Sequence, residues 1–146
     1  MRPRVLAFLL PILILPVLVL ADDQPPARVR ESELSRSPLF VGSLKITVTA
    51  FNRGGPFSIQ RDVEVQIENT SSAFTVFSPQ RLSFVNRDYS QIDLLGIIPA
   101  RGPLVPVADR RIAPGAHVKE IYALNGKVHL PARLYYDEKL LAVIAD

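Results

Sequence analysis

The sequence predicts an all-β protein, with a β-sandwich of about seven to nine strands over residues 39–146. After Pro38, apolar and polar residues alternate in short runs, which is the two-residue period of half-buried strands. These runs recur at a spacing of roughly ten residues, and the prolines and glycines of this region lie mainly between them. No stretch after Pro38 has the period of an amphipathic helix.

The first 21 residues have the features of a secretory signal peptide. Two arginines precede the apolar run Val5–Leu20, and Val19 and Ala21 are the small residues that signal peptidase requires before its cut. We therefore expect cleavage between Ala21 and Asp22. The alternative is a retained N-terminal membrane anchor, but this apolar run is shorter than the roughly 20 residues that span a bilayer core.

Residues 22–38 are polar, charged and interrupted by prolines, and they have no period. Such a composition predicts a flexible linker between the signal peptide and the folded domain. The expected organisation is therefore a signal peptide at 1–21, a linker at 22–38 and one β-sandwich domain at 39–146.

The signal peptide predicts a periplasmic or extracellular protein that meets the membrane only transiently, or through a retained anchor. The chain has no cysteine, so no disulfide bond stabilises the domain, which favours a bacterial exported protein. Removing the two signal-peptide arginines reduces the basic residues from 17 to 15, against 14 acidic residues. A mature charge this close to zero predicts no nucleic-acid partner.

The first predicted strands are the most regular ones. Residues 44–50 alternate as a strand, and the glycine–proline sequence at 52–56 predicts a turn. Residues 62–68 form the clearest alternating run in the chain. Its apolar residues are expected to face the core and its polar residues the solvent: Val63, Val65 and Ile67 against Glu64 and Gln66.

The middle of the domain is less regular. Short strands are predicted at 74–77 and 82–85, and a strand of undefined register at 92–98. Three prolines and a glycine predict a long loop at 99–106, followed by a turn at 113–116.

The end of the chain predicts a pair of strands. Residues 118–123 have a mixed period, whereas 134–136 lead into a hairpin-like turn at 137–139. A final strand is expected at 140–144.

Three short sequences carry a resemblance to a known family: a strand ending in Asn69-Thr70, the turn Pro114-Gly115, and Leu134-Tyr135-Tyr136 near the end of the chain. With these features the chain resembles telokin-like (immunoglobulin-like) exported bacterial domains of unknown function. It is also similar, more weakly, to a β-sandwich proteinase-inhibitor family. The sequence departs from the first family at 86–89, where those domains often have an Asp-Gly turn. The resemblance implies a fold and a location, and it implies no chemistry.

The search for catalytic or metal-binding residues predicts neither an enzyme nor a cofactor. His117 and His129 are twelve residues apart with no cysteine or suitably spaced carboxylate, so no metal site is expected. No G-x-S-x-G motif is present to place a serine nucleophile. One enzymatic alternative stays open, a dispersed pair of carboxylates that meet in the fold. The sequence Asn69-Thr70-Ser71 is either a glycosylation site or simply a turn.

The candidate binding residues are arginines and tyrosines. Arg101, Arg110 and Arg111 flank the proline-rich loop, where they form either an anion-binding rim or an ordinary solvated surface. Tyr135 and Tyr136 are adjacent in a predicted strand, so one is expected in the core and the other on the surface.

Together these observations predict an exported, non-enzymatic β-sandwich that binds a protein or envelope partner. The alternative is a small-ligand or proteinase-inhibitor-like module that uses the loop at 99–111. A dispersed-site enzyme is the third candidate. A flat exposed edge or an aromatic patch would favour the first function, and an apolar cleft with converging polar groups would favour the other two.

Overall fold

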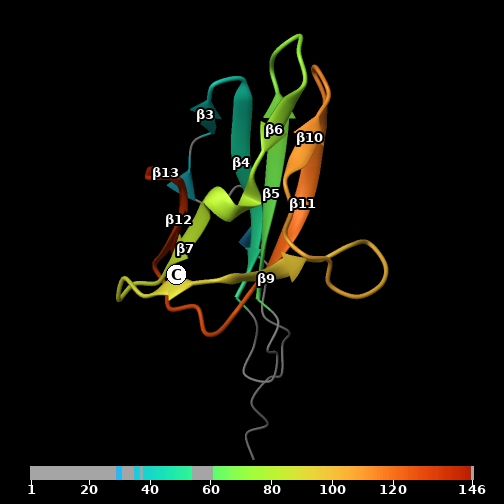
Figure 1. Cartoon of the computed structure of the whole chain (residues 1–146). Coiled ribbons are helices and arrows are strands. Elements are labelled where there is room, and N and C mark those ends of the chain that lie inside the picture. Colours follow the sequence, from blue (N-terminus) through green and yellow to red (C-terminus); the bar gives the residue numbers. More distant parts are fainter. Residues whose placement is uncertain (1–28, 31–34, 37, 54–60, 146) are drawn as a thin grey trace, which may run out of the picture.

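The computed structural model describes residues 29–30, 35–36, 38–53 and 61–145. Within these ranges the protein is all-β: every strand pairing is antiparallel, and the only helical element is the short 3₁₀ turn η2 (Pro79–Arg81). The all-β prediction is therefore confirmed (Figure 1). The predicted signal peptide at 1–21 lies outside the described residues. In the described part of the chain, no helix is long and apolar enough to cross a membrane.

The larger sheet, called sheet 1 below, has strand order β1-β4-β5-β11-β9, with β3 paired to part of β4. Its strands are β1 (Val29–Arg30), β3 (Leu39–Val41), β4 (Leu44–Asn52), β5 (Asp62–Asn69), β9 (Leu94–Ile97) and β11 (His117–Leu124). The long strands β4, β5 and β11 lie side by side in its centre (Figure 1). Strand β9 is an edge strand, paired to β11.

The second sheet, called sheet 2, has strand order β2-β13-β12-β7-β8. Its strands are β2 (Ser35–Arg36), β7 (Leu82–Val85), β8 (Gln91–Ile92), β12 (Ala132–Tyr136) and β13 (Lys139–Ile144). A separate pair consists of β6 (Thr75–Phe77) and β10 (Arg110–Ile112).

One hydrophobic core receives side chains from both sheets. Phe51 of β4 stacks on Phe84 of β7 with ring centroids 5.7 Å apart, which joins sheet 1 to sheet 2. The predicted alternation in β5 is confirmed on the core side, because its three apolar side chains are fully buried: Val63, Val65 and Ile67. Each such side chain contributes roughly 1.5–3 kcal/mol to folding by leaving water.

The described residues form thirteen strands, of which eleven lie within residues 39–146, where seven to nine are expected from the sequence. The additional strands have two or three residues, too short to show a period. The strand predicted at 92–98 is two strands, β8 and β9, because the chain passes from sheet 2 to sheet 1 between them.

Most of the predicted linker at 22–38 lies outside the described residues. Two short strands within it have defined pairings, β1 with β4 and β2 with β13. Part of this polar segment therefore adds backbone pairs to both sheets, although its side-chain pattern predicts no strand.

Candidate functional site

A concave surface lies beside β9 and the end of β11. The chain leaves β9, forms a loop, and returns along the outer edge of the strand. There the backbones of Ile97 and Val105 exchange two hydrogen bonds, with N···O distances of 2.8 and 2.9 Å. Gly96 makes this approach possible, because a Cβ atom there would lie 2.8 Å from the carbonyl oxygen of Val105.

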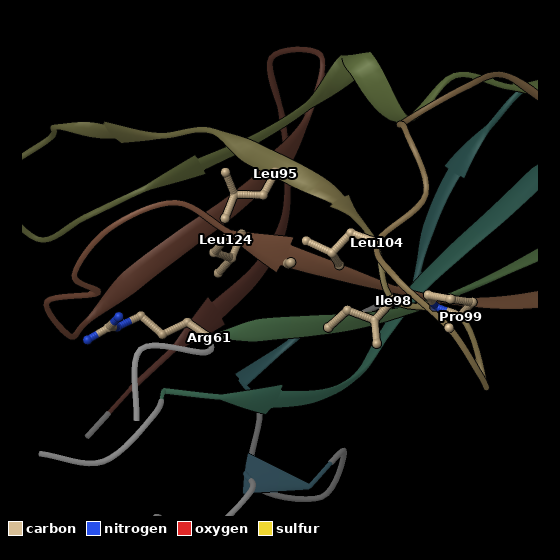
Figure 2. Close-up of a pocket in the computed structure, with 8 residues that line it drawn as sticks. Arg61, Leu95, Ile98, Pro99, Leu104 and Leu124 are labelled. Carbon is tan, nitrogen blue, oxygen red and sulfur yellow. The ribbon is translucent and has the colours of Figure 1, made fainter. Parts of the chain in front are cut away.

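The returning loop closes one side of a pocket of about 380 Å³. The lining residues come from β9, the loop that follows it, the end of β11 and the residue that precedes β5. They are Arg61, Leu95, Ile98, Pro99, Gly102, Leu104, Ala123 and Leu124. Figure 2 shows the leucine and isoleucine side chains gathered around one space, with the Arg61 guanidinium extending away from Ile98 and Leu104. The pocket therefore offers a mainly apolar surface.

Exposed apolar side chains stand around this pocket. The relative exposures of Leu95, Leu104 and Val105 are 54, 48 and 47%. Scattered exposed leucines are ordinary on protein surfaces, but a contiguous group at a pocket indicates a binding surface. Ala123 adds only a methyl group to the lining, which leaves space between the longer side chains.

Compared with protein-family models, curated proteins and solved structures, the chain shows no significant match. The function of the pocket therefore has to be argued from its geometry. The pocket was only partly foreseen from the sequence: the loop at 99–111 was a candidate ligand-binding segment, and it supplies one wall. The contributions of Leu95 and Ala123 were missed because their pattern is that of ordinary strand residues.

The three predicted arginines have separate environments and not a common one. Arg101 is exposed in the loop that lines the pocket. Arg110 pairs with Glu120, and the Arg111 guanidinium carbon lies 4.3 Å from the ring centroid of Phe74. Successive residues of a strand point to opposite sides, so Arg110 and Arg111 diverge from β10.

Arg110 reaches from the surface into a partly buried polar cluster. Its Nε and Nη2 atoms lie 2.7 and 2.6 Å from Oε1 of Glu120, whose side chain is only 3% exposed. The hydroxyl of the fully buried Tyr122 donates to the other carboxylate oxygen of Glu120. Burial raises the pKa of Tyr122, and its hydrogen bond to Glu120 raises it further. The cluster satisfies a buried carboxylate and attaches β10 to sheet 1.

Tyr136, one of the two candidate binding tyrosines, is fully buried and cannot belong to an exposed binding surface. Its ring stacks on Phe77 at a centroid distance of 5.3 Å, and its hydroxyl accepts a hydrogen bond from Nη1 of Arg81 at 3.3 Å. Tyr135 is the half-buried member of the pair, on the opposite face of β12. The sequence required one tyrosine in the core without deciding which one.

The two histidines lie on different elements. His117 begins β11, and His129 lies in the loop that follows the same strand. The eight-residue strand β11 begins at His117 and ends at Leu124, before the loop that contains His129. Across the described ranges, no three histidine, cysteine, aspartate or glutamate side chains gather closely enough to hold a metal ion.

Asn69, the asparagine of the possible glycosylation site, is completely buried. Its Nδ2 atom donates to the carbonyl oxygens of Ala73, Ile112 and Ala113 at 2.7, 3.1 and 3.1 Å. Its Oδ1 atom accepts hydrogen bonds from the backbone and hydroxyl of Ser71. A glycan on Nδ2 would displace these partners, so the turn is the interpretation that the fold supports.

Proposed function

We propose that this chain is an exported, non-enzymatic immunoglobulin-like β-sandwich that binds a protein or envelope partner. The contact is an apolar group of the partner that enters the pocket beside β9. The observation that carries this proposal is the pocket of about 380 Å³ surrounded by exposed leucine and valine side chains.

The fold part of the proposal follows from the core. Two antiparallel sheets contribute to a single hydrophobic cluster, and each sheet keeps alternate side chains outside that cluster. Two sheets that share one core in this way are typical of sandwiches. The predicted signal peptide supports export to the periplasm or the extracellular space.

The size of the pocket suits one bulky apolar group. Sites for small molecules usually have volumes of about 300–1,000 Å³, so this pocket is at the lower end of that range. Burying the exposed half of a leucine or valine on its rim contributes roughly 1 kcal/mol per side chain, because the value of about 1.5–3 kcal/mol applies to complete burial. Several such contributions are needed, because association itself costs translational and rotational freedom.

A small apolar ligand is the second candidate, because the loop at 99–111 supplies the pocket wall through Pro99, Gly102 and Leu104. The two candidates differ in how they use the rim. A small ligand lies within the pocket, whereas a protein partner also covers the exposed side chains around it.

The test compares two leucines with the same 48% exposure, Leu104 on the pocket rim and Leu140 on β13. Immobilised wild-type, Leu104→Ser and Leu140→Ser domains are incubated with extracts of the source organism's envelope, and retained proteins are quantified by mass spectrometry. We expect specific partners to be retained by wild-type and Leu140→Ser but lost by Leu104→Ser. Equal retention by both variants would exclude the pocket as the contact.

A fluorescence titration with the neutral apolar dye N-phenyl-1-naphthylamine separates the two candidates. Ala123→Phe fills the pocket, whereas Leu104→Ser mainly changes its rim. Under the small-ligand alternative, wild type binds the dye saturably, Ala123→Phe does not, and neither Leu104→Ser nor Leu140→Ser changes partner retention.

A further inference from the structure

Tyr89 is the most exposed of the large hydrophobic residues that the structure describes, at 77%. It lies in the turn between β7 and β8 with a φ of 65°, a left-handed backbone conformation. Residues with a Cβ atom rarely adopt this conformation, and holding one there costs of order 1–3 kcal/mol. An exposed ring contributes little to the core, so its strained position has no explanation in packing.

The turn is held in place by two side chains. Asn86 is buried, and its Oδ1 atom accepts a hydrogen bond of 2.8 Å from the backbone N–H of His129. Its Nδ2 atom donates to Oγ of Ser90 at 3.0 Å and to the carbonyl oxygen of Lys127 at 3.3 Å. Asp88 accepts hydrogen bonds from the backbone and hydroxyl of Ser90 at 3.1 and 2.6 Å. The backbone beneath Tyr89 is therefore fixed while its ring stays in solvent.

Three basic residues belong to this turn or to the segments beside it. The Arg133 guanidinium carbon lies 5.7 Å from the ring centroid of Tyr89. The backbone N–H of Arg87 bonds to the carbonyl of His129 at 3.1 Å, which places the turn beside the loop that holds Lys127. In the part of the chain that the structure describes, none of these three cations forms an ion pair.

The single carboxylate of the turn does not neutralise this charge. Hydrogen bonds from Ser90 lower the pKa of Asp88, so its carboxylate is ionised at neutral pH but is directed to its own turn. Three cations against one carboxylate leave a local positive charge around an exposed aromatic ring.

We propose that the turn carrying Tyr89 and Arg87, together with the neighbouring Lys127 and Arg133, binds an acidic peptide segment of a protein partner. The cations pair with its carboxylates, and the tyrosine ring packs against an apolar side chain between them. Tyrosine and arginine are the residues that most often dominate protein interfaces. A polyanion without apolar groups would need the cations alone, so the ring favours a peptide of mixed acidic and apolar character. A fixed turn also reduces the entropy lost on binding.

This surface is independent of the pocket beside β9. The turn joins two strands of sheet 2 and shares no residue with the pocket lining. The two proposals therefore succeed or fail separately.

The probe is a fluorescein-labelled peptide of repeated Glu-Asp-Leu, with a Gln-Asn-Leu peptide as the neutral control. Anisotropy titrations use the whole mature chain at low salt. We expect the acidic peptide to bind at least about tenfold more tightly than the neutral one, and the affinity to fall with added salt.

Tyr89→Gly separates binding from stability. Glycine adopts a φ of 65° without strain, so this variant should be at least as stable as the wild type towards urea. We expect its affinity for the acidic peptide to fall about fivefold or more, because the ring is lost. A structural role for Tyr89 would predict the opposite pattern, lower stability with unchanged affinity.

A matched pair of charge variants tests whether the site matters or only the net charge. Arg133→Gln and Lys139→Gln each remove one positive charge, but Lys139 lies at the β12–β13 turn, away from Tyr89. We expect about a tenfold loss for Arg133→Gln and less than twofold for Lys139→Gln. Equal losses, no preference for the acidic peptide, or tighter binding of polygalacturonate would each overturn the proposal.

Discussion

Two buried asparagines connect strand ends to distant turns and loops through side-chain hydrogen bonds. Asn69 joins the end of β5 to the turn before β11, and Asn86 joins the end of β7 to the loop after β11. Each side-chain amide forms hydrogen bonds with backbone groups that would otherwise be left unpaired in the turns. Their partners are 41 to 44 residues away in sequence, which is why the sequence identifies these asparagines only as turn residues.

Asn69→Ala should reduce the free energy of unfolding by about 2–4 kcal/mol, because three carbonyl oxygens lose their donor. The control is Thr70→Ala, which removes one exposed hydrogen bond to the carbonyl of Ser43 and should cost about 1 kcal/mol or less. Urea unfolding of both variants measures the difference. Equal urea midpoints would mean that Asn69 is not the central support of this turn.

Neighbouring residues on β5 should respond differently to a change of charge. Val65 is fully buried, so Val65→Asp should cost several kcal/mol as an unpaired carboxylate enters the core. The expectation that Glu64 simply faces solvent is incomplete. Its Oε1 atom accepts a hydrogen bond from Thr49 at 2.6 Å and lies 3.1 Å from Nζ of Lys119.

Glu64→Lys should therefore cost about 1 kcal/mol, since it removes the carboxylate that pairs with Lys119 and places a second cation diagonally across β5 and β11 from that lysine. Gln66→Ala, which changes no charge, provides the control on the same face. Urea midpoints measured with all three variants should rank Val65→Asp far below Glu64→Lys. A Glu64→Lys midpoint equal to that of the wild type would show that its contacts contribute nothing.

At the scale of elements, sequence alternation predicts strands well where every inward residue is apolar. Residues 63–67 of β5 meet that condition, and their predicted core-facing side chains agree with the structure. Strand β11 does not, because Glu120 faces the core between apolar neighbours and disguises the two-residue period. The buried carboxylate is tolerated because Arg110 and Tyr122 donate hydrogen bonds to it. No local pattern in the sequence predicts these contacts.

The pocket illustrates the same limit. The proline-rich loop was recognised as a candidate binding segment, yet the site depends on its return along β9. That return requires Gly96, because a Cβ atom there would collide with the returning backbone. In the sequence, this glycine indicates only that the strand is irregular. Long-range backbone contacts, and not local propensity, therefore determine where the candidate site forms.

The attachment of β10 to sheet 1 should weaken in alkali. Burial and Glu120 raise the pKa of Tyr122 above its usual value of 10.0, whereas the unfolded chain keeps that value. A group with a raised pKa in the folded state stabilises the fold fully below the unfolded pKa, and this contribution is lost as the pH rises. The free energy of unfolding should therefore fall as the pH is raised from 9 to 11.

Tyr122→Phe tests this assignment. The variant should be less stable at pH 8 by about 1–3 kcal/mol, because Glu120 loses a donor. It should also lose less stability than the wild type between pH 9 and 11, because its phenyl ring does not ionise. Tyr135→Phe, on the half-buried tyrosine, should keep the wild-type pH dependence. Identical slopes for wild type and Tyr122→Phe would contradict the assignment.

At the scale of the whole molecule, the two proposed contacts use different parts of one rigid frame. The pocket lies beside the edge strand of sheet 1, and the Tyr89 turn joins two strands of sheet 2. The shared core fixes both surfaces, while their residues contribute little to that core. Composition and alternation are sufficient to predict such a frame, but the surfaces depend on how distant loops meet, and so the sequence alone predicts only part of them.

Both proposed contacts assume that the chain is exported, and the first 21 residues make that assumption testable. Signal peptidase requires a small residue immediately before its cut, and Ala21 occupies that position ahead of Asp22. Intact-mass analysis of the exported protein should give Asp22 as its N-terminus. Ala21→Leu should prevent the cut and leave a species that begins at Met1 in the membrane fraction, whereas Ala27→Leu, beyond the junction, should be processed normally. A wild-type protein that stays in the membrane with Met1 intact would instead establish the retained anchor, and the partner would then be sought at the membrane surface.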